Sequence, residues 1–367
     1  MGLIAATLKK GLKRQNTCRF RAGVFVMNTD TEKTNKHKNG DLIDQLNKRI
    51  LVLDGAMGTM VQSFALDEND FRGSILKDHI IELKGNNELL SLTMPEVIES
   101  IHRSFLKAGA DIIETNTFNG NRISQSEFST ENLIPDMNFA AAKIARKVAD
   151  ETSYVDPSKP RFVCGVLGPT NKMASLSPDV QNPQVRSFDF EDFKDAYYEQ
   201  AIALIEGGVD CLMIETVFDT LNAKAALVAI DEAFNVSEKQ LPLMISVTIT
   251  DASGRTLSGQ TIEAFWYSVN HANLLSAGIN CALGVELIEP YLKDLARVCD
   301  RYVSVHPNAG LPNELGEYDE SPEFMAEFIG RFSREGLVNF VGGCCGTTPE
   351  HIRAIAEAVQ SVTPRKV

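Results

Sequence analysis

Short apolar runs recur along the chain at nearly even intervals, and each one ends in small or polar residues. They are rich in β-branched residues and apolar at consecutive positions, which is typical of strands buried on both faces of a parallel sheet. The runs are Ile50–Leu53, Ala110–Ile113, Phe162–Leu167, Cys211–Ile214, Leu243–Ile249, Ala277–Ile279, Tyr302–Val305 and Leu337–Val341. The pattern therefore predicts eight strands covered by other elements.

Helical patterns separate these strands. Thr93-Met94-Pro95-Glu96 predicts a capping box with proline in the first turn, and an apolar face at helical spacing follows until Gly109. A second such face ends at Gly207-Gly208, and Ser321-Pro322-Glu323 predicts the start of a later helix that Gly336 closes. Alternating strands and helices indicate an α/β fold with a parallel sheet. Eight units without a G-x-G-x-x-G phosphate turn favour a closed (β/α)8 TIM barrel over an open doubly wound sheet.

Polar residues follow the predicted strands, at the end where barrel enzymes keep their chemistry. They are Asp54, Glu114-Thr115-Asn116, Gly168-Pro169-Thr170, Glu215-Thr216, Thr248 with Thr250, Asn280-Cys281, His306-Pro307-Asn308 and Cys344-Cys345. The long connections 54–92, 168–190 and 306–320 are expected to line a binding site over this face. A helix over Asp41–Lys48 is expected to cap the opposite end of the barrel.

Two adjacent cysteines in Gly342-Gly343-Cys344-Cys345-Gly346 are the most informative motif. A strand would point neighbouring side chains to opposite faces, so both sulfurs can face one way only if the flanking glycines turn the backbone. Cys281 also ends an apolar run beside glycine. Three converging thiolates predict a zinc site with room for a fourth ligand.

The alternative for any cysteine is that of a small buried hydrophobe, and we assign Cys164, Cys211 and Cys299 to this class. A disulfide between Cys344 and Cys345 would be strained, because unstrained bridges need well-separated Cα atoms. For this pair and Cys281, metal binding is the favoured interpretation.

A zinc ion held by three thiolates carries a net charge of about −1 and generates hydroxide poorly. It is better suited to hold a fourth thiol as thiolate, because a metal-bound thiol loses its proton. Free thiols are mostly protonated near neutral pH and are weak nucleophiles. The motif therefore points to alkyl transfer onto the sulfur of a bound thiol.

Length and composition are those of a globular protein, with 367 residues, 44% hydrophobic and 23% charged residues. One barrel typically needs about 250 residues or more. We expect a basic and polar disordered leader over 1–40, with a transit-like segment as the alternative, the barrel over 41–363 and a tail over 364–367.

Charge and cysteine usage exclude several partners and compartments. Residues 1–29 hold six basic residues and no acid, which leaves 30 basic against 49 acidic residues in the remainder of a chain of net charge −13. This balance disfavours a nucleic-acid partner, and no apolar run approaches the length of a membrane span. Seven irregularly spaced cysteines favour a reducing, cytoplasmic location.

Several motifs together resemble the homocysteine-binding domain of cobalamin-dependent methionine synthase, within the wider homocysteine S-methyltransferase superfamily. The cysteine motifs indicate the superfamily, and the Asp54 and Asp251 segments narrow the resemblance to methionine synthase. The motifs run in order from about residue 41 to the end: Asp54–Met60, Lys84–Asn87, Glu114–Asn119, Gly165–Asn171, Asp251–Thr256, Asn280–Gly284, His306–Gly310 and Gly342–Pro349.

The resemblance implies catalytic zinc on Cys281, Cys344 and Cys345, with the homocysteine thiolate as fourth ligand. It implies that Asp54 and Glu215 receive the substrate ammonium, and that backbone N–H groups near Gly55 and Ala56 hold its carboxylate. Glu114 and Asn308 are further substrate-site candidates; Asn308 is expected to fill the open zinc position in the absence of substrate. Each of these residues also has a structural alternative: Asp54 as a turn residue, Glu215 in a structural ion pair and Asn308 as a loop residue with its hydrogen bonds satisfied. His306 is expected to support the site or the fold and not to bind the metal.

The resemblance also implies a methyl donor outside this chain. Full-length methionine synthase continues into folate-binding and cobalamin-binding modules, and no Asp-x-His-x-x-Gly cobalamin motif is present in this sequence. We therefore expect a subunit of a split enzyme or a fragment, which receives the methyl group from methylcobalamin on another module. The alternatives are a stand-alone enzyme that uses betaine or S-methylmethionine, and a zinc- and thiol-binding module without turnover.

Overall fold

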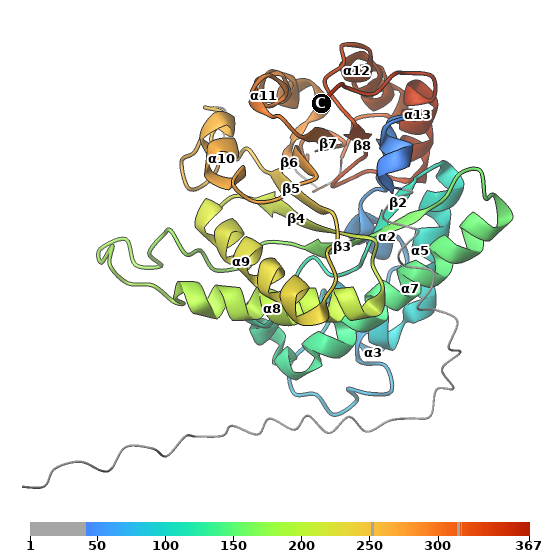
Figure 1. Ribbon diagram of the computed structural model, residues 1–367. Coiled ribbons are helices and arrows are strands. Elements are labelled where there is room, and N and C mark those ends of the chain that lie inside the picture. Colours follow the sequence, from blue (N-terminus) through green and yellow to red (C-terminus); the bar gives the residue numbers. More distant parts are fainter. Residues whose placement is uncertain (1–41, 251–252, 314–315, 317) are drawn as a thin grey trace, which may run out of the picture.

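The eight predicted strands form a parallel barrel (Figure 1) in the computed structural model, which describes residues 42–250, 253–313, 316 and 318–367. The strand order is β1-β8-β7-β6-β5-β4-β3-β2, and a parallel bridge between Leu53 and Ile112 closes the ring. The predicted (β/α)8 TIM barrel is thus confirmed. The strands are β1 Leu51–Val52, β2 Ile112–Glu114, β3 Phe162–Leu167, β4 Cys211–Val217, β5 Leu243–Val247, β6 Ser276–Gly284, β7 Tyr302–Asn308 and β8 Phe340–Val341.

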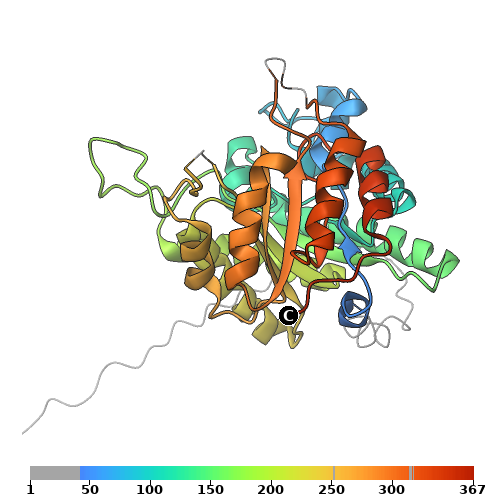
Figure 2. The same cartoon turned by 90° about the horizontal axis from the view of Figure 1, so that it is seen from above.

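Helices surround the barrel and run along its strands, as the perpendicular view in Figure 2 shows. Short helices near the start of the described chain belong to the connections after β1 and β2. The α-helices are α2 Met57–Ser63, α3 Glu68–Arg72, α4 Leu90–Thr93, α5 Pro95–Ala108, α6 Arg122–Gln125, α7 Ile134–Val155, α8 Phe190–Gly207, α9 Thr220–Ser237, α10 Ile262–Val269, α11 Val285–Val298, α12 Pro322–Arg334 and α13 Pro349–Val359. The 3-10 helices are η2 Asn87–Leu89, η3 Ser126–Phe128 and η4 Glu131–Leu133.

Most helix boundaries lie where the sequence predicts them. Gly109, with φ of 120°, ends α5, and Gly208, with φ of 94°, ends α8. The Ser321 side chain accepts a hydrogen bond from the Phe324 N–H and caps α12. The prediction of a capping box at Thr93 was wrong, because Met94 is the N-cap residue of α5 and makes no side-chain cap hydrogen bond. Thr93 is instead the last residue of α4, and its hydroxyl donates to the Leu89 carbonyl at 3.4 Å.

The interior of the barrel is filled by apolar side chains. Leu51, Phe162 and Met213 belong to this cluster, which also contains Cys164 and Cys211. Residues 42–46 are helical, and Leu42 and Leu46 are fully buried against the same cluster. This confirms the expected cap at the amino-terminal end of the barrel, apart from Asp41, which lies outside the described residues.

Several expectations concern the ends of the chain and the loops. The predicted leader, with Cys18, and the Asp251-Ala252 part of one motif lie outside the described residues. The Arg365 side chain donates hydrogen bonds to the carbonyls of Arg301, Ala296 and Cys299, so this residue of the expected tail packs on the barrel. Among the described helices, none has the length and apolar character needed to cross a bilayer.

Candidate functional site

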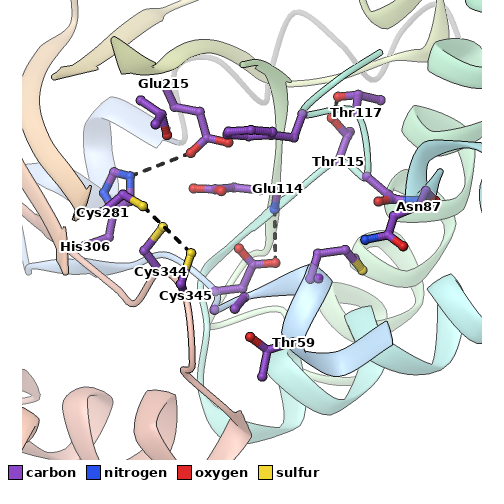
Figure 3. Close-up of a pocket in the computed structure, with 18 of the residues that line it drawn as sticks. Thr59, Asn87, Glu114, Thr115, Thr117, Glu215, Cys281, His306, Cys344 and Cys345 are labelled. Atoms are coloured by element: carbon purple, nitrogen blue, oxygen red, sulfur yellow. Dashed lines mark hydrogen bonds and ion pairs between the residues drawn. The ribbon is translucent and has the colours of Figure 1, made fainter. Parts of the chain in front are cut away.

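A cavity of about 240 Å³ lies at the carboxyl ends of the strands. Figure 3 shows sulfur atoms on one side of it and carboxylates facing them. The lining residues are Asp54, Gly55, Ala56, Met57, Gly58, Thr59, Asn87, Glu88, Glu114, Thr115, Asn116, Thr117, Phe118, Asn119, Glu215, Thr216, Cys281, His306, Gly343, Cys344 and Cys345. Most of the predicted strand-end residues thus meet in one cavity.

The predicted cysteine trio lies together at this cavity. The Cys281 and Cys345 sulfurs are 3.8 Å apart, and all three Sγ atoms lie within 4.8 Å of one another. In a tetrahedral zinc site with bonds of about 2.3 Å, neighbouring sulfurs are about 3.8 Å apart. The spacing and the soft donor set therefore fit a zinc ion.

Hydrogen bonds to the backbone fix the loop that carries the vicinal cysteines. The Cys344 N–H donates to the Pro307 carbonyl at 2.8 Å, and the Ala309 N–H donates to the Cys345 carbonyl at 2.9 Å. The turn that the sequence predicts at the glycines is completed at Gly346, whose φ is +80°. Both bonds run to the strand end of β7, so the position of the two sulfurs depends on that neighbouring strand.

Hydrogen bonds within the trio favour an ionised sulfur at Cys345. The Cys281 and Cys344 thiols hydrogen-bond to the Cys345 sulfur and lower the pKa of Cys345 to about 3. The Asn280 side-chain amide also donates to the Cys344 sulfur at 3.9 Å. A thiolate stabilised by neighbouring thiols is a suitable starting state for metal binding, since thiolates are the ligating form.

Three carboxyl groups form the other side of the cavity, of which Asp54 and Glu215 are buried and Glu114 is half-buried. Asp54 follows β1, Glu114 ends β2 and Glu215 lies within β4, near its carboxyl end. The Glu114 N–H donates to Asp54 Oδ2 at 3.1 Å. Burial raises the pKa of Asp54 and of Glu114 well above the usual range, and it raises the pKa of Glu215 to about 8. Among the described residues, no lysine or arginine lines the cavity, so this side favours a cationic ligand group.

His306 lies between the two sides. Its Nε2 atom is 3.9 Å from Glu215 Oε2, and ligand atoms of His306, Glu114 and Glu215 lie within 4.8 Å of one another. Burial lowers the pKa of His306 to about 3, so the imidazole is neutral at physiological pH. Neither ring nitrogen has a hydrogen-bond partner in the described protein.

The loop after β1 approaches the barrel closely. A Cβ at Gly55 would lie 2.8 Å from both Phe105 Cε1 and Thr347 Oγ1, so only glycine fits there without a shift. The Ala56 N–H donates to Thr347 Oγ1 at 3.2 Å, and the Thr347 hydroxyl donates to the Cys344 carbonyl at 2.7 Å. A substrate carboxylate at Ala56 would therefore compete with the Thr347 hydroxyl.

Not every predicted residue reaches the cavity. Asn308 ends β7, is 3% exposed and has no partner for Oδ1, but it does not line the cavity. The connection 168–190 contributes no lining residue, so the expectation for that loop was wrong: it extends away from the mouth (Figure 1, the green loop before α8). The other two long connections contribute, through 54–59 with 87–88 and through His306.

Some lining residues were not singled out from the sequence. Met57, Thr59 and Asn87 fall within motifs that were recognised as whole segments, and Glu88 directly follows one of them. The Thr59 hydroxyl accepts a hydrogen bond from the Gly346 N–H at 3.1 Å and so links the first loop to the cysteine loop. Their position beside recognised motifs is the signal that would have found them.

The predicted structural cysteines are confirmed as buried: Cys164, Cys211 and Cys299 all lie in the core and are free. Cys164 and Cys211 are register partners on β3 and β4. None of the three belongs to the sulfur cluster at the cavity.

Comparison with solved structures identifies a similar fold. The homocysteine methyltransferase MmuM from Escherichia coli in its metallated form is 21% identical, with a TM-score of 0.64 over 87% of this chain and 99% of that one. Its oxidised form gives 20% identity and a TM-score of 0.68 over the same shares, and its apo form 20% identity and 0.62 over 86% of this chain and 98% of that one.

A protein-family model also matches most of the chain. The model for homocysteine S-methyltransferases matches residues 51–359, which include all the residues that line the cavity. This is more than half of the chain. The chain therefore belongs to the homocysteine S-methyltransferase family.

Proposed function

We propose that this protein transfers a methyl group to the sulfur of homocysteine and produces methionine. The observation that carries the proposal is one small cavity with a cluster of three cysteine sulfurs on one side and three carboxyl groups on the other. Homocysteine carries a thiol at one end and an ammonium group at the other. The family of the chain supports the same reaction.

Cys281, Cys344 and Cys345 would hold zinc, since their spacing fits a tetrahedral ion. When bound, zinc would supply Lewis acidity that keeps the substrate thiol ionised at neutral pH. Asp54 and Glu215 would receive the ammonium group, with Glu114 beside them. Backbone near Gly55 and Ala56 would hold the carboxylate, and Asn308 remains a candidate for the neighbourhood of the metal.

For the methyl donor, we propose methylcobalamin on a separate cobalamin-binding module, with folate chemistry on a further module. The Asp54 and Asp251 motifs support this choice. In this proposal the chain works in the cytoplasm and activates only the acceptor.

A stand-alone enzyme that uses S-methylmethionine or betaine is the second candidate. It is favoured by the comparison with the E. coli homocysteine methyltransferase, because this chain covers 99% of that one and the two share the barrel. A zinc- and thiol-binding module without turnover is the third class, and it predicts binding without methyl transfer.

One assay separates the three. The purified full chain is incubated with zinc, homocysteine and one donor at a time: free methylcobalamin, methylcobalamin on a separate cobalamin-binding protein, methyltetrahydrofolate, S-methylmethionine or betaine. We expect slow methionine formation from free methylcobalamin, faster formation with the carrier protein because effective concentration rises, and none from methyltetrahydrofolate. Rapid turnover with S-methylmethionine or betaine would establish the stand-alone enzyme, and inactivity with every donor would establish the binding module.

A further inference from the structure

Two strand ends at the cavity contain bulges with unusual backbone. The pairing of β4 with β5 shifts register between Ile214 and Val217, and that of β6 with β7 shifts between Asn280 and Gly284. Inside these bulges Thr216 has φ of 56° and Cys281 has φ of 59°. Such values are unfavourable for residues other than glycine, most clearly for β-branched threonine, and persist only where the surroundings enforce them.

One buried side chain connects the two bulges. Asn280 is 0% exposed, and its Oδ1 accepts hydrogen bonds from the Thr216 N–H at 3.1 Å and the Ser246 hydroxyl at 2.7 Å. Its Nδ2 donates to Thr216 Oγ1 at 2.8 Å and to Cys344 Sγ at 3.9 Å. The carboxamide oxygen and nitrogen of Asn280 thus both hydrogen-bond to Thr216, and the nitrogen also contacts the cysteine loop after β8.

These contacts lie between the two functional halves of the cavity. Glu215, a proposed ammonium partner, directly precedes Thr216, and Cys281, a proposed metal ligand, directly follows Asn280. We propose that Asn280 is a positioning residue that ties the β4 bulge to the β6 bulge, and so sets where Cys281 lies relative to Glu215 and Cys344. This inference rests on the proposed function.

The test compares Asn280→Ala with a matched buried asparagine at the other end of the barrel. Asn339 is also 0% exposed, accepts from the Val303 N–H at 3.0 Å and donates to the Arg365 carbonyl at 2.7 Å. For each full-length variant, zinc affinity is measured by chelator competition, thiolate coordination by the charge-transfer absorption of bound cobalt(II), and Tm without metal.

We expect Asn280→Ala to weaken zinc binding about 10- to 100-fold, as for other groups that orient metal ligands, and to change the cobalt(II) spectrum. Asn339→Ala should lower Tm and leave both metal readouts unchanged. Thr216→Gly, added to Asn280→Ala, should recover part of the affinity, because glycine adopts this φ freely. Full affinity in Asn280→Ala, an equal loss in Asn339→Ala, or no recovery in the double variant would overturn the positioning role.

The wild-type chain separates this inference from the proposed function. Failure of the wild-type protein to bind one zinc would overturn the proposed function itself. Normal wild-type zinc binding with an unaffected Asn280→Ala variant would overturn only the role of Asn280.

Discussion

Replacing Glu215 by glutamine tests how the protein recognises the ammonium group of its substrate. The substitution keeps the shape of the side chain and removes the negative charge that Glu215 would carry once an ammonium group lies beside it, at a site that is 7% exposed. In the described protein, the Glu215 carboxyl group comes within ion-pair distance of His306, but that imidazole is neutral and its Nε2 is 3.9 Å away, which is too far for a hydrogen bond. The Glu215 carboxyl group is therefore available for a ligand cation, which would favour its ionised form.

The expected loss of binding free energy depends on how many carboxyl groups contact the substrate ammonium group. A hydrogen bond to a charged group contributes about 1.5–3 kcal/mol. Because Asp54 and Glu114 remain in the Glu215→Gln variant, we expect a loss in the lower part of this range, about 1.5–2 kcal/mol. This corresponds to an increase of about 10- to 30-fold in the Kd for homocysteine.

The assay is calorimetric titration of the zinc-loaded protein with homocysteine and with 4-mercaptobutanoate, which lacks the amino group. Glu215→Gln should weaken homocysteine binding and leave 4-mercaptobutanoate binding almost unchanged. The control variant is Glu88→Gln, because Glu88 also lines the cavity and is buried but already accepts the Asn119 N–H at 2.9 Å. An equal loss for both ligands would show that Glu215 supports the fold of the site, and an unchanged Kd for homocysteine would refute its role in recognition.

Three further predictions follow from the same geometry. Serine at Cys281, Cys344 or Cys345 should abolish stoichiometric zinc by metal analysis, whereas serine at Cys164, Cys211 or Cys299 should retain it; the reverse pattern would refute the ligand assignment. Homocysteine binding should release about one proton from the thiol near neutral pH, because the thiol must ionise to bind zinc, and a further fraction from Glu215 as that group pairs with the ammonium. Calorimetry in buffers of different ionisation heat measures this, and no release would mean that the thiol never reaches the metal. In the metal-free protein, the pKa of Glu215 is raised to about 8 by burial, so the folded protein keeps a proton that the unfolded chain releases above about pH 4.5. The stability contributed by this proton is lost as pH rises toward 8. The Tm of Glu215→Gln minus the Tm of the wild type should therefore increase between pH 5 and pH 8, and a constant difference would contradict the raised pKa.

The sequence was sufficient to predict the strands because a strand of a parallel barrel is buried on both faces. Phe162–Leu167 was predicted with the bounds that β3 has, since all six of its positions are apolar or glycine and all are buried. The cysteine trio could also be predicted from the sequence, because the type of residue and its place at a strand end indicate the chemistry. Closure of the ring then brings Cys281 beside Cys345, although they are far apart in the chain.

Other features depended on contacts between distant residues. The sequence places polar groups at the ends of the third and fifth strands as well, and only the packed barrel leaves Gly168–Thr170, Thr248 and Thr250 outside the cavity. The same holds for the loop 168–190, whose length alone gave no indication of its direction.

The deepest difference lies in the backbone of the site. The amino-acid types at positions 215, 216, 280 and 281 are given by the sequence, but the left-handed conformations of Thr216 and Cys281 are not, because neither residue prefers them. Asn280, buried by the closed barrel, bonds to Thr216 and Ser246 at the ends of β4 and β5 and, in our proposal, holds these conformations. The sequence by itself therefore determined the fold and the donor atoms, while the tertiary structure decided where those atoms point, since that depends on hydrogen bonds formed only after the strands have come together.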